Sequence, residues 1–324
     1  MTSPLLEIKN LTTWYPIRRG VLARTVGHVE AVTEVSLTLS EGETLGLVGE
    51  SGCGKSTLGR TLGGLEEAQS GEVWFRGRLL AGTRRSSEER RSIQMVFQDP
   101  VASLNPRLTV LDLLTEGLEH HGLLTGTKEA AALQLLGDVG LDASALHRYP
   151  FEFSGGQRQR INIARALSLR PAVLVCDEAV SALDVSVQAQ VLNLLSDLKE
   201  KYRLSYLFIS HDLGVVRYIS DRIAVMYLGR VVEEGPAEQV MDQPRHPYTE
   251  ALLSAIPVPG QRRAGRRVLS GELPSPSRPP SGCPFHPRCP KAMPVCQLRW
   301  PLEAREGLHS VHCHLYAPGI DSNV

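Results

Sequence analysis

The stretch GESGCGKS, residues 49–56, constrains the fold of this 324-residue chain more than any other feature. An apolar run, Thr44–Val48, precedes it, and a segment with helical character follows it as far as Leu65. Its glycines allow the backbone to turn sharply and to aim successive N–H groups inward. A strand, a glycine-rich loop and a helix in this order predict an α/β fold whose sheet is largely parallel.

The loop matches the pattern G-x-x-x-x-G-K-[ST] in full, which predicts a binding site for the phosphates of ATP. We expect Lys55 to bind the β- and γ-phosphates and the Ser56 hydroxyl to bind Mg²⁺. The N-terminus of the following helix adds the positive end of its dipole. Cys53 is expected to fill the loop and not to act as a nucleophile. The residues expected to contact the nucleotide are Gly49, Ser51, Gly52, Cys53, Gly54, Lys55, Ser56 and Thr57.

An apolar strand at residues 172–176 ends in two carboxylates. Ligands of open α/β sheets bind at the carboxyl ends of the strands, so we expect Asp177 beside the phosphate loop, where it binds Mg²⁺ with Ser56. Glu178 projects elsewhere and is the expected general base for an attacking water. These few groups are sufficient for phosphoryl transfer, which needs positioning and charge neutralisation more than covalent catalysis.

The composition excludes several classes of protein. Lysine plus arginine equals aspartate plus glutamate at 35 each, so no overall field favours nucleic acid. No stretch reaches the ~18 consecutive apolar residues of a membrane span, and the N-terminus lacks the pattern of an export signal. We therefore expect the protein to stay in the cytosol, where disulfides are disfavoured, so its cysteines need another explanation.

The remaining chain alternates short strand and helix signals. Short strands are predicted at residues 5–9 and 35–39. Helical periodicity dominates from about residue 108 to 150, and strand signals return after residue 172. Residues 256–290 are rich in Pro, Gly, Ser and Arg and show no sustained periodicity. This composition predicts a linker or an irregular extension.

Residues 153–157 read FSGGQ and are followed by RQRINIARAL. This stretch resembles the signature sequence of the ABC ATPases, whose usual form begins with Leu where this chain has Phe153. The resemblance implies a P-loop NTPase core with an antiparallel β subdomain and a helical insertion at about residues 100–165. It also implies a head-to-tail dimer, in which each signature contacts the ATP bound by the partner. The signature residues that would do so are Ser154, Gly155, Gly156 and Gln157.

Other positions resemble further motifs of the same family. Gln98, in QDPVASLNP, resembles the Q-loop residue that senses the metal and the attacking water and contacts the membrane subunits. Asp184, in SALD, resembles the D-loop residue that reaches across the dimer, and His211 resembles the switch histidine that contacts the γ-phosphate. Tyr15 resembles the aromatic residue that stacks on adenine, although Trp14 beside it is an alternative.

The sequence around these motifs resembles that of the oligopeptide/dipeptide importers, notably in CDEAVSALDVSVQAQVLNLL and HPYTEALLSAIP. The basic insertion IRRGVLARTVGHVEAV looks like that of the second of their two ATPases. The resemblance implies ATP hydrolysis that powers peptide uptake at the cytoplasmic face of the membrane. It implies as partners two transmembrane permease subunits, a second homologous ATPase subunit and an extracytoplasmic binding protein. Related systems carry nickel, glutathione, murein peptides or sugars, and a non-transport ABC ATPase is a further alternative.

Four cysteines lie in the C-terminal extension, which we assign to residues 256–324, after an ATP-binding domain of residues 1–255. Clustered cysteines in a reducing compartment favour a metal, but their spacing lacks the C-x₂-C of most zinc ribbons. The pattern resembles the extension of peptide-importer ATPases, in which four cysteines bind a [4Fe–4S] cluster. Zinc, with His312 or His314, and free thiols are the alternatives. The cysteines are Cys283, Cys289, Cys296 and Cys313.

Overall fold

The computed structural model describes residues 3–20, 23–255 and 272–316. The strands are β1 (Leu6–Arg19), β2 (Arg24–Leu39), β3 (Thr44–Val48), β4 (Ser70–Phe75), β5 (Arg78–Leu79), β6 (Ile93–Val96), β7 (Val173–Asp177), β8 (Ser205–Ile209), β9 (Arg222–Tyr227), β10 (Arg230–Pro236), β11 (Glu303–Glu306) and β12 (His309–His312). The α-helices are α1 (Lys55–Leu62), α2 (Ser87–Ser92), α3 (Pro100–Ser103), α4 (Val110–His120), α5 (Lys128–Asp138), α6 (Gly155–Ser168), α7 (Val185–Tyr202), α8 (Leu213–Ile219), α9 (Ala237–Asp242) and α10 (Pro247–Ser254). Short 3₁₀ turns are η1 (Ala143–Ala145), η2 (Pro150–Glu152), η3 (His286–Arg288) and η4 (Pro294–Gln297).

The central sheet has the strand order β11-β12-β10-β9-β3-β8-β7-β6. From β9 to β6 the neighbouring strands run parallel, whereas β10, β12 and β11 continue the sheet in antiparallel pairs. Parallel strands with both faces covered should be apolar throughout, and every residue of β3, β7 and β8 is buried. The predicted α/β core with a largely parallel sheet is confirmed.

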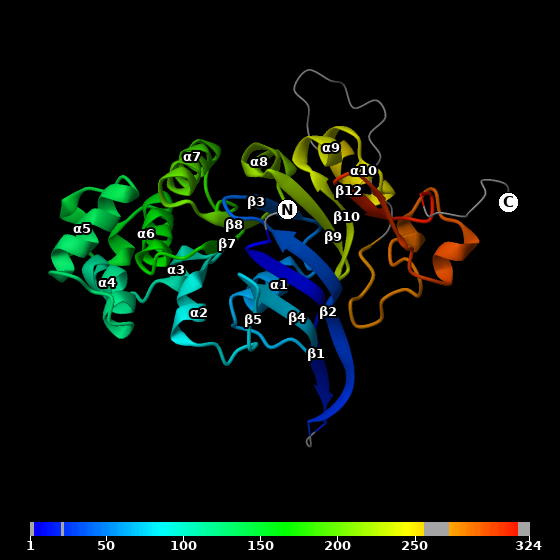
Figure 1. The fold of residues 1–324 in the computed structure, drawn as a ribbon, viewed down its shortest axis with the longest axis horizontal. Helices are drawn as coiled ribbons and strands as arrows, with labels where there is room; N and C mark the ends of the chain where they lie inside the picture. The colour runs from blue at the N-terminus through cyan, green and yellow to red at the C-terminus, as the bar shows by residue number, and fades with distance from the viewer. Residues whose placement is uncertain (1–2, 21–22, 256–271, 317–324) are drawn as a thin grey trace.

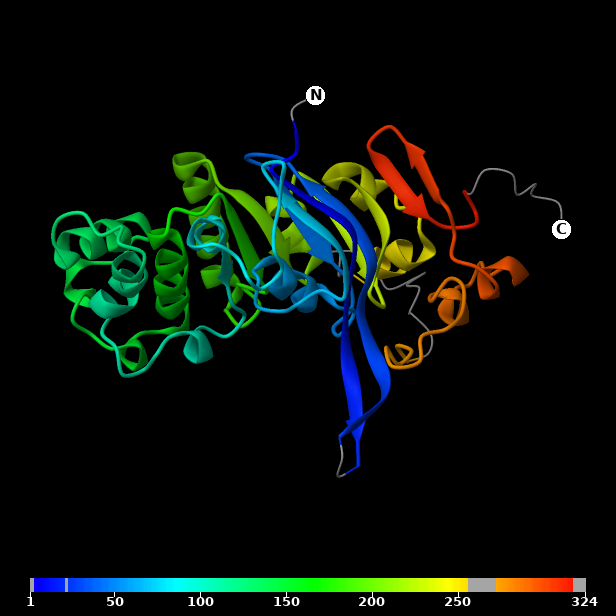
Figure 2. The ribbon, with the colours of Figure 1, turned by 60° about the horizontal axis from the view of Figure 1, so that its bottom comes forward.

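A second, antiparallel sheet has the order β2-β1-β4-β5. Its two long strands, β1 and β2, extend as a ribbon beyond the body of the molecule (Figures 1 and 2). The sequence predicted only short strands here, at residues 5–9 and 35–39. The register between β1 and β2 shifts after Ile8 and again after Leu11, so the alternation of side chains is interrupted although the strand continues.

Helices α4, α5 and α6 pack against one another at the end of the molecule opposite the extension (Figure 1). The inner face of α4 is buried through Val110, Leu113 and Leu114. The helix begins with a capping box, in which Thr109 and Asp112 satisfy backbone N–H groups of the first turn. These helices fall within the insertion predicted at about residues 100–165, whose bounds as a subdomain stay a prediction.

The described part of the extension, residues 272–316, packs on the central sheet and adds two strands to it. Strand β12 pairs with β10, and β11 pairs with β12. The sequence predicted irregular structure here, because strands of four residues are too short to show a period. The first part of the predicted linker, residues 256–271, lies outside the described residues. The boundary between the two predicted domains therefore stays a prediction.

Phe285 anchors the extension, and its replacement by alanine should destabilise the fold. Its ring is 1% exposed and lies 5.2 Å from the ring of Tyr227 and 5.4 Å from that of Tyr248, centroid to centroid. We expect Phe285→Ala to lower the free energy of unfolding by about 3–5 kcal/mol, measured by denaturant titration. The control Leu308→Ala changes a side chain that is 69% exposed and should cost less than about 0.5 kcal/mol. Equal losses for the two variants would contradict this packing.

Candidate nucleotide-binding and hydrolysis site

The phosphate loop joins β3 to α1 and is pressed against two other backbone segments. A Cβ atom on Gly49 would lie 2.1 Å from the carbonyl oxygen of Met226, and one on Gly54 would lie 1.8 Å from that of Ala31. Gly54 also has φ 106°, a conformation that side chains disfavour. Glycine at these positions therefore lets the loop lie directly on the end of β9 and the middle of β2.

Replacing Gly54 by alanine should disable the site, because the new methyl group would displace the loop from Ala31. We expect Gly54→Ala to lower ATP hydrolysis by about 100-fold, since small displacements of positioning groups cost that much. The matched control is Gly77→Ala, at the β4–β5 turn, where φ is 72° but no atom lies within 4 Å of the new Cβ. Both changes strain the backbone, so equal losses of activity would show that the close contact is unimportant.

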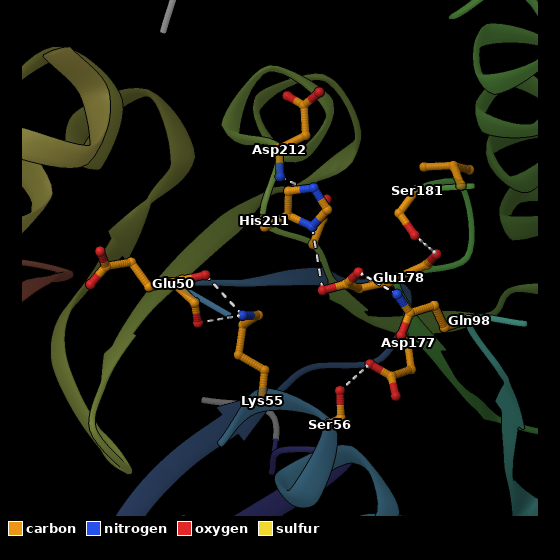
Figure 3. Close-up of polar contacts among 12 residues, drawn as sticks. Glu50, Lys55, Ser56, Gln98, Asp177, Glu178, Ser181, His211 and Asp212 are labelled. Carbon is orange, nitrogen blue, oxygen red and sulfur yellow. Dashed lines mark hydrogen bonds and ion pairs between the residues drawn. The ribbon is translucent and has the colours of Figure 1, made fainter. Parts of the chain in front are cut away.

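Lys55 is 4% exposed, and its ammonium group is held by the loop itself (Figure 3). Its Nζ donates to the carbonyl oxygens of Gly49 at 2.8 Å and Glu50 at 3.0 Å. These bonds stabilise the compact shape of the loop and keep a positive charge beside it. Cys53 is buried behind the loop, and burial raises the pKa of its thiol, in agreement with a space-filling role.

The expected magnesium ligands lie in direct contact. Ser56 Oγ donates to Asp177 Oδ1 at 2.8 Å, across the gap between α1 and β7 (Figure 3). Burial raises the pKa of the Asp177 carboxyl, an effect opposed by the Ser56 hydrogen bond and the charge of Arg60. A hydroxyl and a carboxylate beside the phosphate loop are the oxygen ligands that Mg²⁺ prefers, so these residues fit the ion.

Glu178 is held between Gln98 and His211, which follow two other strands of the same sheet. Its Oε2 accepts from Gln98 Nε2 at 2.9 Å, and its Oε1 lies 3.3 Å from His211 Nδ1 (Figure 3). The backbone of Glu178 has φ 48°, a strained value for a residue other than glycine. Ser181 Oγ donates a hydrogen bond to the Glu178 carbonyl oxygen at 2.9 Å. The strained turn directs the carboxylate away from Asp177, as the sequence predicted, and its role as base stays a prediction.

A cavity of about 310 Å³ opens in front of these groups. Tyr15 lines it, and the Tyr15 hydroxyl lies 3.5 Å from Thr57 Oγ1. Trp14 is absent from the described residues of this lining, and its indole N–H donates to Thr33 Oγ1 at 3.0 Å. The geometry therefore places Tyr15 at the site, while its stacking on adenine stays a prediction. The described residues that line the cavity are Tyr15, Val29, Ala31, Ser51, Gly52, Gly54, Lys55, Ser56, Thr57, Gln98, Glu178 and Pro276.

The signature residues are absent from that described lining. Ser154 instead caps α6 in a capping box: its Oγ accepts from Gln157 N at 3.4 Å, and Gln157 Oε1 accepts from Ser154 N at 3.1 Å. Ser154, Gly155 and Gln157 are exposed, Gly156 is half-buried, and Asp184 is exposed at the start of α7. Of the two sets of residues predicted to contact phosphates, the phosphate loop lines the described cavity of this chain and the signature residues do not.

The four extension cysteines are buried or half-buried. Burial raises the pKa of the Cys283, Cys289 and Cys313 thiols, and neighbouring backbone N–H groups oppose this effect. Met293 N donates to Cys296 Sγ at 3.4 Å.

Burial, with smaller contributions from the charges of Cys296, Cys313 and Cys289, raises the pKa of Cys283 to about 12, so the four thiols lie near one another. Among residues 3–20, 23–255 and 272–316, no group of three or more Cys, His, Asp or Glu side chains is arranged to hold a single metal ion.

The sequence alone did not predict two residues that reach this site from the extension. Pro276 lines the cavity, and Arg288 binds the side chain of Glu50, the second residue of the phosphate-loop motif. Neither belongs to a motif, and both are separated from the loop by more than 200 positions, so no local pattern could have indicated them.

Comparison with known families agrees with this geometry. The family described as "ABC transporter" matches residues 32–181, and the one described as "Oligopeptide/dipeptide transporter, C-terminal region" matches residues 232–296. The oligopeptide transport ATP-binding protein AppF of Bacillus subtilis is 51% identical over 97% of this chain and 98% of its own length. The dipeptide transport ATP-binding protein DppF of Haemophilus influenzae is 50% identical over 92% of both chains.

A solved structure shares the fold. The dimeric ATP-binding cassette MJ0796, in a post-hydrolysis state with ADP and Pi, is 28% identical with a TM-score of 0.62. The match covers 72% of this chain and 98% of that one.

The fold and the site define a P-loop ATPase. The chain belongs to the ATP-binding proteins of the ABC transporter family, in its oligopeptide/dipeptide group, as the signature sequence indicated. Within the described ranges, no helix is both long and apolar enough to cross a membrane.

Proposed function

We propose that this chain hydrolyses ATP to power the import of oligopeptides or dipeptides. The observation that carries the proposal is the placement of Gln98 and His211 against the Glu178 carboxylate, beside a complete phosphate loop. The peptide assignment is supported by the relatives, which are named as oligopeptide or dipeptide transport proteins, and by the match over residues 232–296. Nickel, glutathione, murein peptides or sugars are alternative cargoes of the same motor.

In the proposed reaction, the phosphate loop and Lys55 bind the β- and γ-phosphates, and Ser56, Gln98 and Asp177 hold Mg²⁺. The ion, when bound, neutralises charge that develops on the phosphate oxygens. Glu178 orients a water molecule whose oxygen bonds to the γ-phosphorus, and it takes a proton from that water. The bond from the γ-phosphorus to the bridging oxygen breaks, and that oxygen stays with ADP.

The second half of the ATP site is proposed to come from a homologous ATPase subunit. Ser154, Gly156 and Asp184 are absent from the described lining of their own cavity, and the related cassette MJ0796 forms a dimer. In this arrangement, each signature would contact the nucleotide on the other subunit. We place the pair at the cytoplasmic face of the membrane, against two permease subunits that receive substrate from an extracytoplasmic binding protein.

Glu178→Gln tests the proposed base directly. The amide keeps the size of the side chain but cannot take a proton, so we expect retained ATP binding and a turnover reduced by about 10²–10⁴-fold. Phosphate release measures turnover, and the exposed Glu200→Gln variant on α7 should match the unchanged protein. Turnover that is unchanged in Glu178→Gln would remove Glu178 as the base.

We further propose that the four extension cysteines bind a [4Fe–4S] cluster with a structural or regulatory role outside ATP hydrolysis. Two observations support this assignment: the four thiols lie close enough to influence one another's charge, and Cys296 Sγ accepts a backbone hydrogen bond from Met293 N, a bond of the kind that stabilises sulfur carrying negative charge. Zinc and free thiols are the alternatives.

Metal analysis of protein purified without oxygen separates these possibilities. We expect about four iron atoms per chain and the broad visible absorption of a cluster. Both should be lost in Cys289→Ser and kept in Cys176→Ala, which changes a buried cysteine of β7 outside the extension. Zinc in place of iron would support the zinc alternative, and the absence of both metals would support free thiols.

A further inference from the structure

Glu50 is the residue through which the C-terminal extension reaches the phosphate loop. Its carboxylate accepts two bonds from the Arg288 guanidinium, at 2.7 and 3.0 Å. Its backbone N–H donates to the Tyr248 hydroxyl at 2.8 Å, and its carbonyl oxygen accepts from Lys55 at 3.0 Å. The side chain and both backbone polar groups of Glu50 are therefore hydrogen-bonded, and the partners lie on three different elements: η3, α10 and α1.

The Glu50 carboxylate points away from Lys55 and from Glu178 (Figure 3). It is also absent from the described lining of the nucleotide cavity, whereas Ser51 and Gly52 of the same loop line that cavity. An acidic side chain beside phosphates would repel them, and its pairing with Arg288 directs that charge to the opposite side of the loop. Glu50 thus acts on the nucleotide through the backbone of the loop and not by contact.

The Arg288 side chain is only 5% exposed and that of Glu50 26%, so the pair is partly shielded from water. Around it stand Phe285 and Tyr227, and the Tyr227 hydroxyl lies 3.4 Å from Arg288 Nη1. A two-point arginine–carboxylate bond in such surroundings has a defined geometry, unlike an exposed ion pair.

A second segment of the extension, at Pro276, reaches the nucleotide cavity itself. The carbonyl oxygen of Pro276 accepts from Glu30 N at 2.9 Å, and Pro276 lines the nucleotide cavity with Tyr15. Glu30 precedes Ala31, whose carbonyl oxygen is the atom that excludes a side chain at Gly54. One segment of the extension therefore supports the phosphate loop directly, and another supports the strand on which the loop rests.

We propose that the C-terminal extension holds the phosphate loop of its own chain in its nucleotide-binding shape, with Arg288 as the positioning residue that acts through Glu50. A loop that is ordered before ATP arrives loses less conformational freedom on binding, so the pair raises affinity without touching the ligand. The extension thereby sets the nucleotide affinity of the ATPase.

Binding of ADP to the full chain, measured by calorimetry, tests this proposal without the complication of turnover. We expect Arg288→Ala to weaken ADP binding by about tenfold, the loss of one charge-assisted interaction. In steady-state hydrolysis the KM for ATP should rise by a similar factor, with a smaller change in kcat, because bound and reacting nucleotide lose the same support. Arg288→Lys should restore part of the affinity.

The matched control is Lys291→Ala. Lys291 belongs to the same extension, lies two residues after Cys289, and pairs with Glu250 of α10 at 2.8 Å instead of with the loop. This variant should bind ADP within about twofold of the unchanged protein, because a partly exposed ion pair contributes little. Equal weakening by the two alanine variants would overturn the role of Arg288 and indicate general loosening of the extension.

Glu50→Gln removes the same pair from the loop side and tests the proposal even where Arg288→Ala fails to fold. We expect it to weaken ADP binding as Arg288→Ala does, and the double variant to be no weaker than either single variant, because both changes break one interaction. Thermal unfolding identifies folded samples. Folded Glu50→Gln with unchanged ADP affinity, or additive losses in the double variant, would contradict the proposal.

Discussion

The close contact of the phosphate loop with neighbouring backbone is the constraint on which the rest of the structure depends. Gly49 and Gly54 have no room for a side chain, because the carbonyl oxygens of Met226 and Ala31 occupy that space. The loop can therefore form only where the central sheet and the antiparallel sheet meet. The same contacts bring the N-terminus of α1 to the carboxyl ends of the parallel strands, where the remaining polar groups gather.

Those polar groups come from adjacent strands, which explains why residues far apart in sequence meet. Strand β7 ends at Asp177 and is followed by Glu178. Gln98 follows β6 and His211 follows β8, and since β6 and β8 flank β7, these two residues lie on opposite sides of Glu178. The surface formed by Ser154 and Asp184 belongs to helix N-termini outside this group. In the proposed function the chain is half of a two-subunit motor, and the extension supports the phosphate loop of its own half.

Sequence and structure agree where a local pattern carries the information. The phosphate loop and the apolar strand before Asp177 are contiguous motifs, and their meeting follows from the rule that parallel strands end at one edge. The β1–β2 ribbon was underestimated because register shifts interrupt its alternation. The sequence did not predict strands β11 and β12, because they are too short to show a period and depend on the pairing of β12 with β10. It did not predict Pro276 and Arg288 either, because each contacts a segment more than 200 residues earlier in the chain.

A structure of the assembled transporter with ATP trapped at the site tests the central claim most directly. The account predicts triphosphate between Lys55 of this chain and the signature of a second ATPase subunit. It also predicts the base Glu178 beside the γ-phosphate and Arg288 still bound to Glu50 behind the loop. Nucleotide held by Lys55 and Ser154 of the same chain, or bound away from residues 49–56, would contradict it.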